Sequence, residues 1–163
     1  MSGRRQRQVA VIGAGGAEEG SEAWTLAEEV GRGLAEAGIA LVCGGGGGVM
    51  EAASRAAAEA GGTVIGIVPG TSVEDANPYC TQVVATGIGH ARNLAVVSSG
   101  EAVIAIGGEW GTLSEIGFAR VIGHEVVALR SWELDGRERM AGGPGVVAVE
   151  TAAEAVAAAL AAL

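Results

Sequence analysis

Residues 39–48 read Ile-Ala-Leu-Val-Cys-Gly-Gly-Gly-Gly-Gly, an apolar run followed directly by five glycines. The same order recurs at 8–16 (QVAVIGAGG) and at 102–111 (AVIAIGGEWG). Uninterrupted apolar runs of this length are typical of parallel strands that are buried on both faces. Because the carboxyl ends of parallel strands lie at one edge of their sheet, we expect the three glycine-rich stretches to meet there.

Segments of helical period alternate with apolar runs along the chain, which is the pattern of a βαβ fold. Apolar residues three and four positions apart predict helices before Gly38, over 49–60 and over 112–122, and a last helix that opens at Thr151. We therefore predict a single Rossmann-like α/β domain with a doubly wound, mainly parallel sheet and helices on both faces. The predicted strands are Gln8–Gly13, Ile39–Cys43, Thr63–Val68, Ala102–Ile106, Glu125–Leu129 and Val146–Val149.

Three segments depart from this alternation. Residues 1–7 contain three arginines and are predicted to be a flexible tail of the domain, which spans 1–163. The interval from Pro69 to Gly87 has proline, glycine and asparagine but no helical stripe, so it is predicted to be a long loop. The charged interval from Arg130 to Gly145 is predicted to be mobile surface.

The chain contains no lysine, which excludes several classes of enzyme. A P-loop nucleotide-binding site, a pyridoxal phosphate enzyme and a Schiff-base aldolase each need a lysine amine. The net charge of −9 disfavours nucleic acid as the main partner, because the field of the protein would repel it. The longest apolar run, at 155–163, is too short to cross a membrane. Cys43 and Cys80 form no dense disulfide pattern, which favours the cytoplasm.

The glycine-rich stretches predict a site for an anion or a nucleotide. Glycine lets the backbone approach a phosphate closely, and helices that begin there present free N–H groups. The dinucleotide fingerprint is incomplete, because Glu18 stands where its third glycine belongs. His90 and His124 have no metal-ligand spacing with each other or with the cysteines, so we expect no metal site.

Two charged residues near this edge are candidates for chemistry. Arg92 begins an apolar segment, so it can point from the start of a helix toward a phosphate or a base. Alternatively, it is a surface arginine that pairs with a glutamate. Glu115 lies three residues after Thr112, the spacing of a capping box, in which its role would be structural. Alternatively, Glu115 is a carboxylate that faces a sugar and stabilises an oxocarbenium-like transition state. The spacing leaves both interpretations open.

The segments Gly89-His-Ala-Arg-Asn93 and Gly107-Gly-Glu-Trp-Gly-Thr-Leu-Ser-Glu115, together with the loop from Gly44 to Met50, closely resemble the LONELY GUY and molybdenum-cofactor-carrier superfamily. In the LONELY GUY branch, enzymes release the free base from cytokinin-type nucleoside 5′-monophosphates. Ile106 stands where that branch has proline, and Asn93 where it usually has lysine. The amino-acid sequences of both segments look more like the second branch, which includes the molybdenum-cofactor carriers.

This resemblance implies roles for particular residues. Arg92 and Glu115 would be the catalytic pair, and no cofactor would be required. The resemblance and the glycine loops together predict a phosphate or nucleotide site made of Gly13, Gly15, Gly45, Gly46, Gly47, Met50, Arg92, Asn93, Gly107, Gly108, Gly111 and Thr112.

Two functions follow as hypotheses. In the first, the protein hydrolyses the N-glycosidic bond of a nucleoside 5′-monophosphate. In the second, the same pocket carries molybdenum cofactor or a related phosphorylated ligand and performs no chemistry. In both, the partner is a small phosphorylated ligand rather than a nucleic acid or a membrane. Members of the superfamily are usually dimers or larger, so the resemblance implies that this chain forms a homodimer or a higher homo-oligomer.

Overall fold

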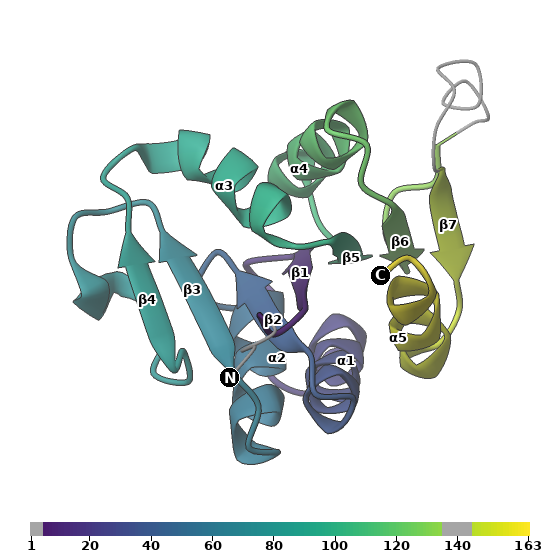
Figure 1. The fold of residues 1–163 in the computed structure, drawn as a ribbon, viewed down its shortest axis with the longest axis horizontal. Coiled ribbons are helices and arrows are strands. Elements are labelled where there is room, and N and C mark those ends of the chain that lie inside the picture. The colour runs from purple at the N-terminus through teal and green to yellow at the C-terminus, as the bar shows by residue number, and fades with distance from the viewer. Residues whose placement is uncertain (1–4, 135–144) are drawn as a thin grey trace.

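The computed structural model describes residues 5–134 and 145–163 and contains a seven-stranded, fully parallel sheet. The strand order is β4-β3-β2-β1-β5-β6-β7, so the sheet runs from β4 on the left of Figure 1 to β7 on the right. The predicted doubly wound α/β fold is confirmed. The strands are β1 (Gln8–Gly13), β2 (Ala40–Cys43), β3 (Val64–Val68), β4 (Gln82–Ala85), β5 (Ala102–Ile106), β6 (Val126–Leu129) and β7 (Val146–Val149).

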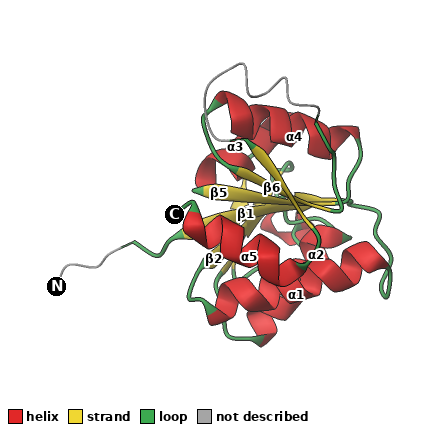
Figure 2. Cartoon of the chain, turned by 90° about the vertical axis from the view of Figure 1, so that its right-hand side faces the viewer, coloured by secondary structure: helices red, strands yellow, loops and turns green. Residues whose placement is uncertain are grey.

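Five α-helices in the described residues cover the two faces of the sheet, which lies edge-on between them in Figure 2. They are α1 (Glu22–Glu36), α2 (Val49–Glu59), α3 (Arg92–Ser99), α4 (Trp110–Val121) and α5 (Ala152–Ala161). Alternate residues of β1 pack to opposite sides. Val9 and Val11 join the core beneath α1, α2 and α5, whereas Ala10 and Ile12 join the core beneath α3 and α4.

The two helices α1 and α2 approach each other closely at Gly31. A Cβ atom at this position would lie 2.1 Å from the carbonyl oxygen of Ala53, closer than any real contact. Small side chains such as these allow the helix backbones to touch, and they explain why an alanine- and glycine-rich sequence can still fill its core.

The prediction of one loop from Pro69 to Gly87 is wrong, because this interval contains β4 and a short 3₁₀ helix, η1 (Val73–Asp75). β4 pairs with β3 at the edge of the sheet, and its side chains alternate between exposed and half-buried. An exposed edge strand of four residues lacks the continuous apolar run by which the other strands were recognised.

The N-termini of α5 and α4 test where the sequence predicted these helices to begin. α5 opens at Thr151, as predicted, with a capping box: the Thr151 hydroxyl accepts from Glu154 N–H, and the Glu154 carboxylate accepts from Thr151 N–H. α4 begins two residues earlier than predicted, and its N-cap is Glu109. Thr112 therefore lies inside the helix, so the capping-box interpretation of Glu115 is wrong.

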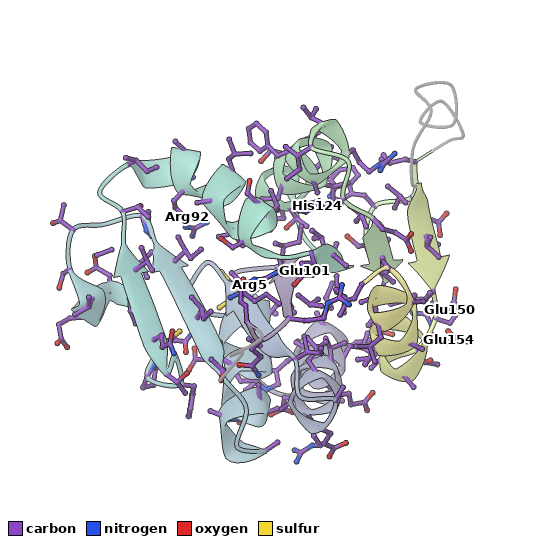
Figure 3. All side chains as sticks on the ribbon, in the orientation of Figure 1. Arg5, Arg92, Glu101, His124, Glu150 and Glu154 are labelled. Carbon is purple, nitrogen blue, oxygen red and sulfur yellow. The ribbon has the colours of Figure 1, made fainter. Side chains whose placement is uncertain are left out.

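The segment before β1 is not wholly a free tail. Arg5 and Arg7 both pair with Glu101 at 3.1 Å, and Figure 3 shows Arg5 beside that carboxylate. Arg7 also donates to the carbonyl of Leu163. Residues 5–7 are thus tied to the sheet and to the C-terminus, while residues 1–4 of the predicted tail lie outside the described residues.

The start of the predicted mobile surface is likewise held in place. Ser131 donates to the carbonyl of Gly107 at 2.6 Å, and the Trp132 indole donates to the carbonyl of Glu109 at 3.2 Å. The rest of that prediction, residues 135–144, lies outside the described residues. Across the parts of the chain that the structure describes, no helix combines the length and the apolar character needed to span a membrane.

Candidate functional site

A cavity of about 340 Å³ opens at the carboxyl ends of the central strands. β1 lies between β2 and β5 in the sheet, and the chain builds outward from it in both directions, so this is the position at which parallel α/β sheets usually bind ligands. The loops that follow β1 and β2 and the first turns of α2, α3 and α4 form the walls. The lining residues are Val11, Ile12, Gly13, Gly15, Gly16, Gly44, Met50, His90, Arg92, Asn93, Glu109, Gly111, Thr112 and Glu115.

The structure brings together many, but not all, of the residues that the sequence predicted. Those that line the cavity are Gly13, Gly15, Met50, Arg92, Asn93, Gly111, Thr112 and Glu115. The structure places Gly45, Gly46, Gly47, Gly107 and Gly108 outside the lining.

Gly45 and Gly46 help to fix the conformation of the glycine loop, residues 44–48. The backbone N–H of Asn77 donates to the carbonyl of Gly45 at 2.7 Å, and its side-chain amide donates to the carbonyl of Gly46 at 3.0 Å. Gly45 has a φ of +71°, which favours glycine. These contacts hold the loop against the connection that precedes β4.

Gly107 and Gly108 line a second hollow of about 360 Å³, together with residues 130–133. Gly108 has a φ of +106°, and a Cβ atom there would lie 2.3 Å from the Thr112 hydroxyl. The absence of a side chain at position 108 therefore allows the chain to turn tightly into α4, and this turn places Gly111 and Thr112 at the cavity.

Six lining residues were not among the predicted binding residues: Val11 and Ile12 of β1, and Gly16, Gly44, His90 and Glu109. Gly16 and Gly44 belong to the same glycine-rich stretches as the predicted positions, so extending each stretch to its full length would have found them. His90 is part of the turn η2 (Gly89–Ala91) that immediately precedes Arg92. Glu109 is the N-cap of α4, a position that became clear only when the start of that helix was known.

The Arg92 guanidinium is held by groups of the protein itself. It extends from the start of α3 toward the sheet (Figure 3), where Nη1 donates to the Asn93 side chain and Nη2 donates to the carbonyl of Gly44 at 3.3 Å. The Arg92 side chain is only 14% exposed, and within the described residues its buried Nε has no hydrogen-bond partner. A buried donor without a partner carries a desolvation cost.

Glu115 faces Arg92 from α4, with its Oε1 4.0 Å from Arg92 Nη1. The residue is 8% exposed. Burial raises the pKa of this carboxyl to about 7, Arg92 opposes the rise, and Cys43 adds to it. Glu115 thus changes its charge near neutral pH, which is a property often found in catalytic carboxylates.

Residues 6–158 match the SLOG cluster4 family. The chain belongs to that family. An uncharacterised protein of Archaeoglobus fulgidus is 42% identical to this SLOG cluster4 chain over 123 residues, which cover 76% of this chain and 80% of the relative.

Two further relatives of the SLOG cluster4 chain carry functional names. The molybdenum cofactor carrier protein of Chlamydomonas reinhardtii has a solved structure that matches with a TM-score of 0.83 and 30% identity, covering 97% of this chain and 98% of the carrier. A probable cytokinin riboside 5′-monophosphate phosphoribohydrolase of Oryza sativa subsp. japonica is 39% identical over 93 residues. That match covers 55% of this chain and 38% of the rice protein. The SLOG cluster4 chain therefore resembles both branches that the sequence motifs indicated.

The cavity at the carboxyl ends of the central strands offers one side chain that binds anions strongly, that of Arg92. Of the described residues that line it, Arg92 is the only arginine, whereas Glu109 and Glu115 are both acidic. Within the same described residues, no three His, Cys, Asp or Glu side chains are grouped closely enough to hold a metal ion. A ligand with a single concentrated negative charge and a neutral remainder suits this distribution best.

Proposed function

We propose that the cavity binds a nucleoside 5′-monophosphate and hydrolyses its N-glycosidic bond. The observation that carries the proposal is the buried pair of Arg92 and Glu115 at the cavity, in which Arg92 Nη1 and Glu115 Oε1 lie 4.0 Å apart. A buried carboxylate beside the arginine opposes the binding of an anion there, because like charges repel. A carboxylate beside the sugar is useful when positive charge develops on the ribose.

The phosphate of the substrate is held by the first turn of α4 and by Arg92. Gly111 and Thr112 line the cavity in that turn, where backbone N–H groups lack partners inside the helix and the helix dipole is positive. The Arg92 guanidinium, which also lines the cavity, supplies a further charged donor. The base then lies toward the loop that follows β1, where Gly15 and Gly16 line the cavity without side chains and leave room for a planar ring.

Glu115 acts in its ionised form. As the bond between ribose C1′ and the base nitrogen breaks, positive charge spreads over C1′ and the ring oxygen, and the carboxylate stabilises it. The oxygen of a water molecule bonds to C1′, one proton of that water ends on the departing base, and ribose 5-phosphate remains. Arg92 keeps the phosphate in position during this change and lowers the pKa of Glu115, which favours the active form.

A second candidate function is that of a carrier for molybdenum cofactor, a phosphorylated pterin. The observation in its favour is the match to the Chlamydomonas carrier over nearly the full length of both chains. Arg92 and the first turn of α4 would hold the phosphate of this cargo in the same way. In this case Glu115 would contribute a contact or a charge balance and no turnover.

One experiment separates the two. Purified protein is incubated with a panel of nucleoside 5′-monophosphates, and free base and ribose 5-phosphate are measured by chromatography. Hydrolysis predicts release of base that Glu115→Gln abolishes, while Glu154→Gln, which changes a carboxylate on α5, leaves release intact. If no panel member releases base, the hydrolase is wrong, and molybdenum and pterin retained by the wild type but lost in Arg92→Ala would support the carrier.

A further inference from the structure

Two cysteine thiols lie together beside the cavity, and neither proposed function uses them. Cys43 is the last residue of β2, and Cys80 lies in the connection just before β4. Cys43 pairs in register with Gly66 of β3, and a Cβ atom at Gly66 would lie 2.6 Å from the sulfur of Cys80. Both cysteines are free thiols in this structure. Cys80 of this thiol pair, Cys43 and Cys80, thus occupies the space that a side chain at position 66 would fill, on the strand next to Cys43.

The surroundings of the thiol pair favour a thiolate. Cys43 Sγ lies 3.5 Å from the hydroxyl of Ser54 and accepts from the backbone N–H of Gly45 at 3.4 Å. Hydrogen bonding from Cys80 lowers the pKa of the Cys43 thiol to about 7, and Ser54 and Gly45 contribute, although burial opposes them. Hydrogen bonding to Cys43, followed by burial, raises the pKa of Cys80. These contacts favour negative charge on Cys43, and a thiolate is the form that reacts with oxidants.

The accessibility of the thiol pair is unequal. Cys43 is fully buried, whereas Cys80 is only partly buried and lies in a surface connection. An oxidant from solution reaches the pair from the side of Cys80. Chemistry at one sulfur then has a second sulfur close by, which is the usual arrangement of a peroxide-reactive cysteine and its resolving partner.

The thiol pair is also connected to the cavity through hydrogen bonds. Asn77 in the Cys80 connection binds the carbonyls of Gly45 and Gly46 in the glycine loop that follows Cys43. The carbonyl of Gly44, next to Cys43, accepts from Arg92 at 3.3 Å. A covalent bond between the two cysteines would therefore fasten the connection to the loop that supports the site arginine.

We propose that Cys43 and Cys80 form a reversible disulfide that tethers the connection 77–80 to the glycine loop 44–48. With hydrogen peroxide as oxidant, the thiolate sulfur takes one peroxide oxygen to give a sulfenic acid, and the other peroxide oxygen leaves as water. The second thiol then attacks the sulfenic sulfur, an S–S bond forms, and the second oxygen leaves as water. Two thiols and one peroxide thus yield one disulfide and two waters, and a dithiol reductant reverses the change.

The test compares the reduced protein with protein treated with hydrogen peroxide and then desalted. Intact mass spectrometry should find the loss of two hydrogen atoms, and alkylation under denaturing conditions should find neither thiol, until dithiothreitol restores both. The unfolding temperature of the oxidised protein should rise by roughly 10 °C, because the bond closes a long loop in the unfolded chain. Cys80→Ser, treated identically, should show neither the mass loss nor the rise.

Three results would contradict the proposed disulfide, and a fourth would contradict its role as a tether. Two alkylatable thiols after oxidation, a disulfide only between different molecules, or oxygen addition without mass loss would each overturn the disulfide. An intramolecular disulfide whose formation leaves the unfolding temperature unchanged or lower would overturn the tether. Cys80→Ala is a second control with a smaller side chain, so that poor folding of one variant does not obscure the comparison.

Discussion

Replacing Glu115 by glutamine should make the stability of the protein less dependent on pH. The ordinary pKa of a glutamate is 4.5, and burial raises that of Glu115 to about 7 in the folded protein. Between these values the folded state holds a proton that the unfolded chain has released. The wild type therefore loses stability as the pH rises from about 4.5 to about 7, whereas Glu115→Gln has no proton to lose at this position.

The size of the effect follows from the two pKa values. Each tenfold change in a proton equilibrium is worth about 1.36 kcal/mol. The free energy of unfolding of the variant, relative to the wild type, should thus increase by about 2.5 kcal/mol between pH 5 and pH 8. This difference does not depend on the constant cost of removing the charge that faces Arg92, because that cost is the same at every pH.

Urea unfolding followed by circular dichroism at pH 5, 6, 7 and 8 measures the difference directly. Glu154→Gln is the matched control: backbone N–H groups of Glu150 and Thr151 lower the pKa of Glu154, so it stays ionised throughout this range. Its effect on stability should be nearly constant with pH. If the Glu115→Gln difference also stays constant to within about 1 kcal/mol from pH 5 to pH 8, burial does not raise the pKa of Glu115 and the reasoning fails.

Four other outcomes are expected. If the protein is a hydrolase, kcat/KM should rise with pH through about 7 as Glu115 ionises, and a flat profile would remove the carboxylate from the mechanism. Thr151→Ala should lower the free energy of unfolding by about 1 kcal/mol through loss of the capping box, as measured in urea. Gly31→Ala should cost about 1–3 kcal/mol, because its methyl group would meet the Ala53 carbonyl; an unchanged urea midpoint would contradict the close helix contact. Val121, 84% exposed on α4, is expected to help form a homo-oligomer, so light scattering should find a smaller species for Val121→Glu, and a monomeric wild type would refute this.

Much of the sheet could be predicted because its central strands are buried on both faces. Leu41 and Ile104 are fully buried, and both stand in continuous apolar runs that few other structures produce. β4 lies at the edge, where Val84 is 51% exposed, so its sequence resembles that of a loop. The signal that could have identified it is the stretch Val83-Val84, since β-branched residues favour strands.

The site was harder to predict than the fold, because its members come from different elements. Arg92 and Glu115 lie on α3 and α4, and nothing in their separation along the chain requires that they meet. The sequence also could not distinguish glycines at the cavity, such as Gly13, from those that turn the chain elsewhere, such as Gly108. That distinction depends on the direction of the backbone after each strand, which the residue type alone does not determine.

The strand order has a consequence for synthesis of the chain. β1 pairs on one side with β2 but on the other with β5, where Val9 lies opposite Ala102. On the ribosome, β2, β3 and β4 each emerge next to a strand that is already present, whereas one side of β1 stays open until β5 arrives. An open strand edge invites association with other chains. Because α4 follows β5 closely, the nascent protein covers this side of β1 and gains its last cavity wall at nearly the same moment, so the ability to bind ligand reports that β1 is paired on both sides.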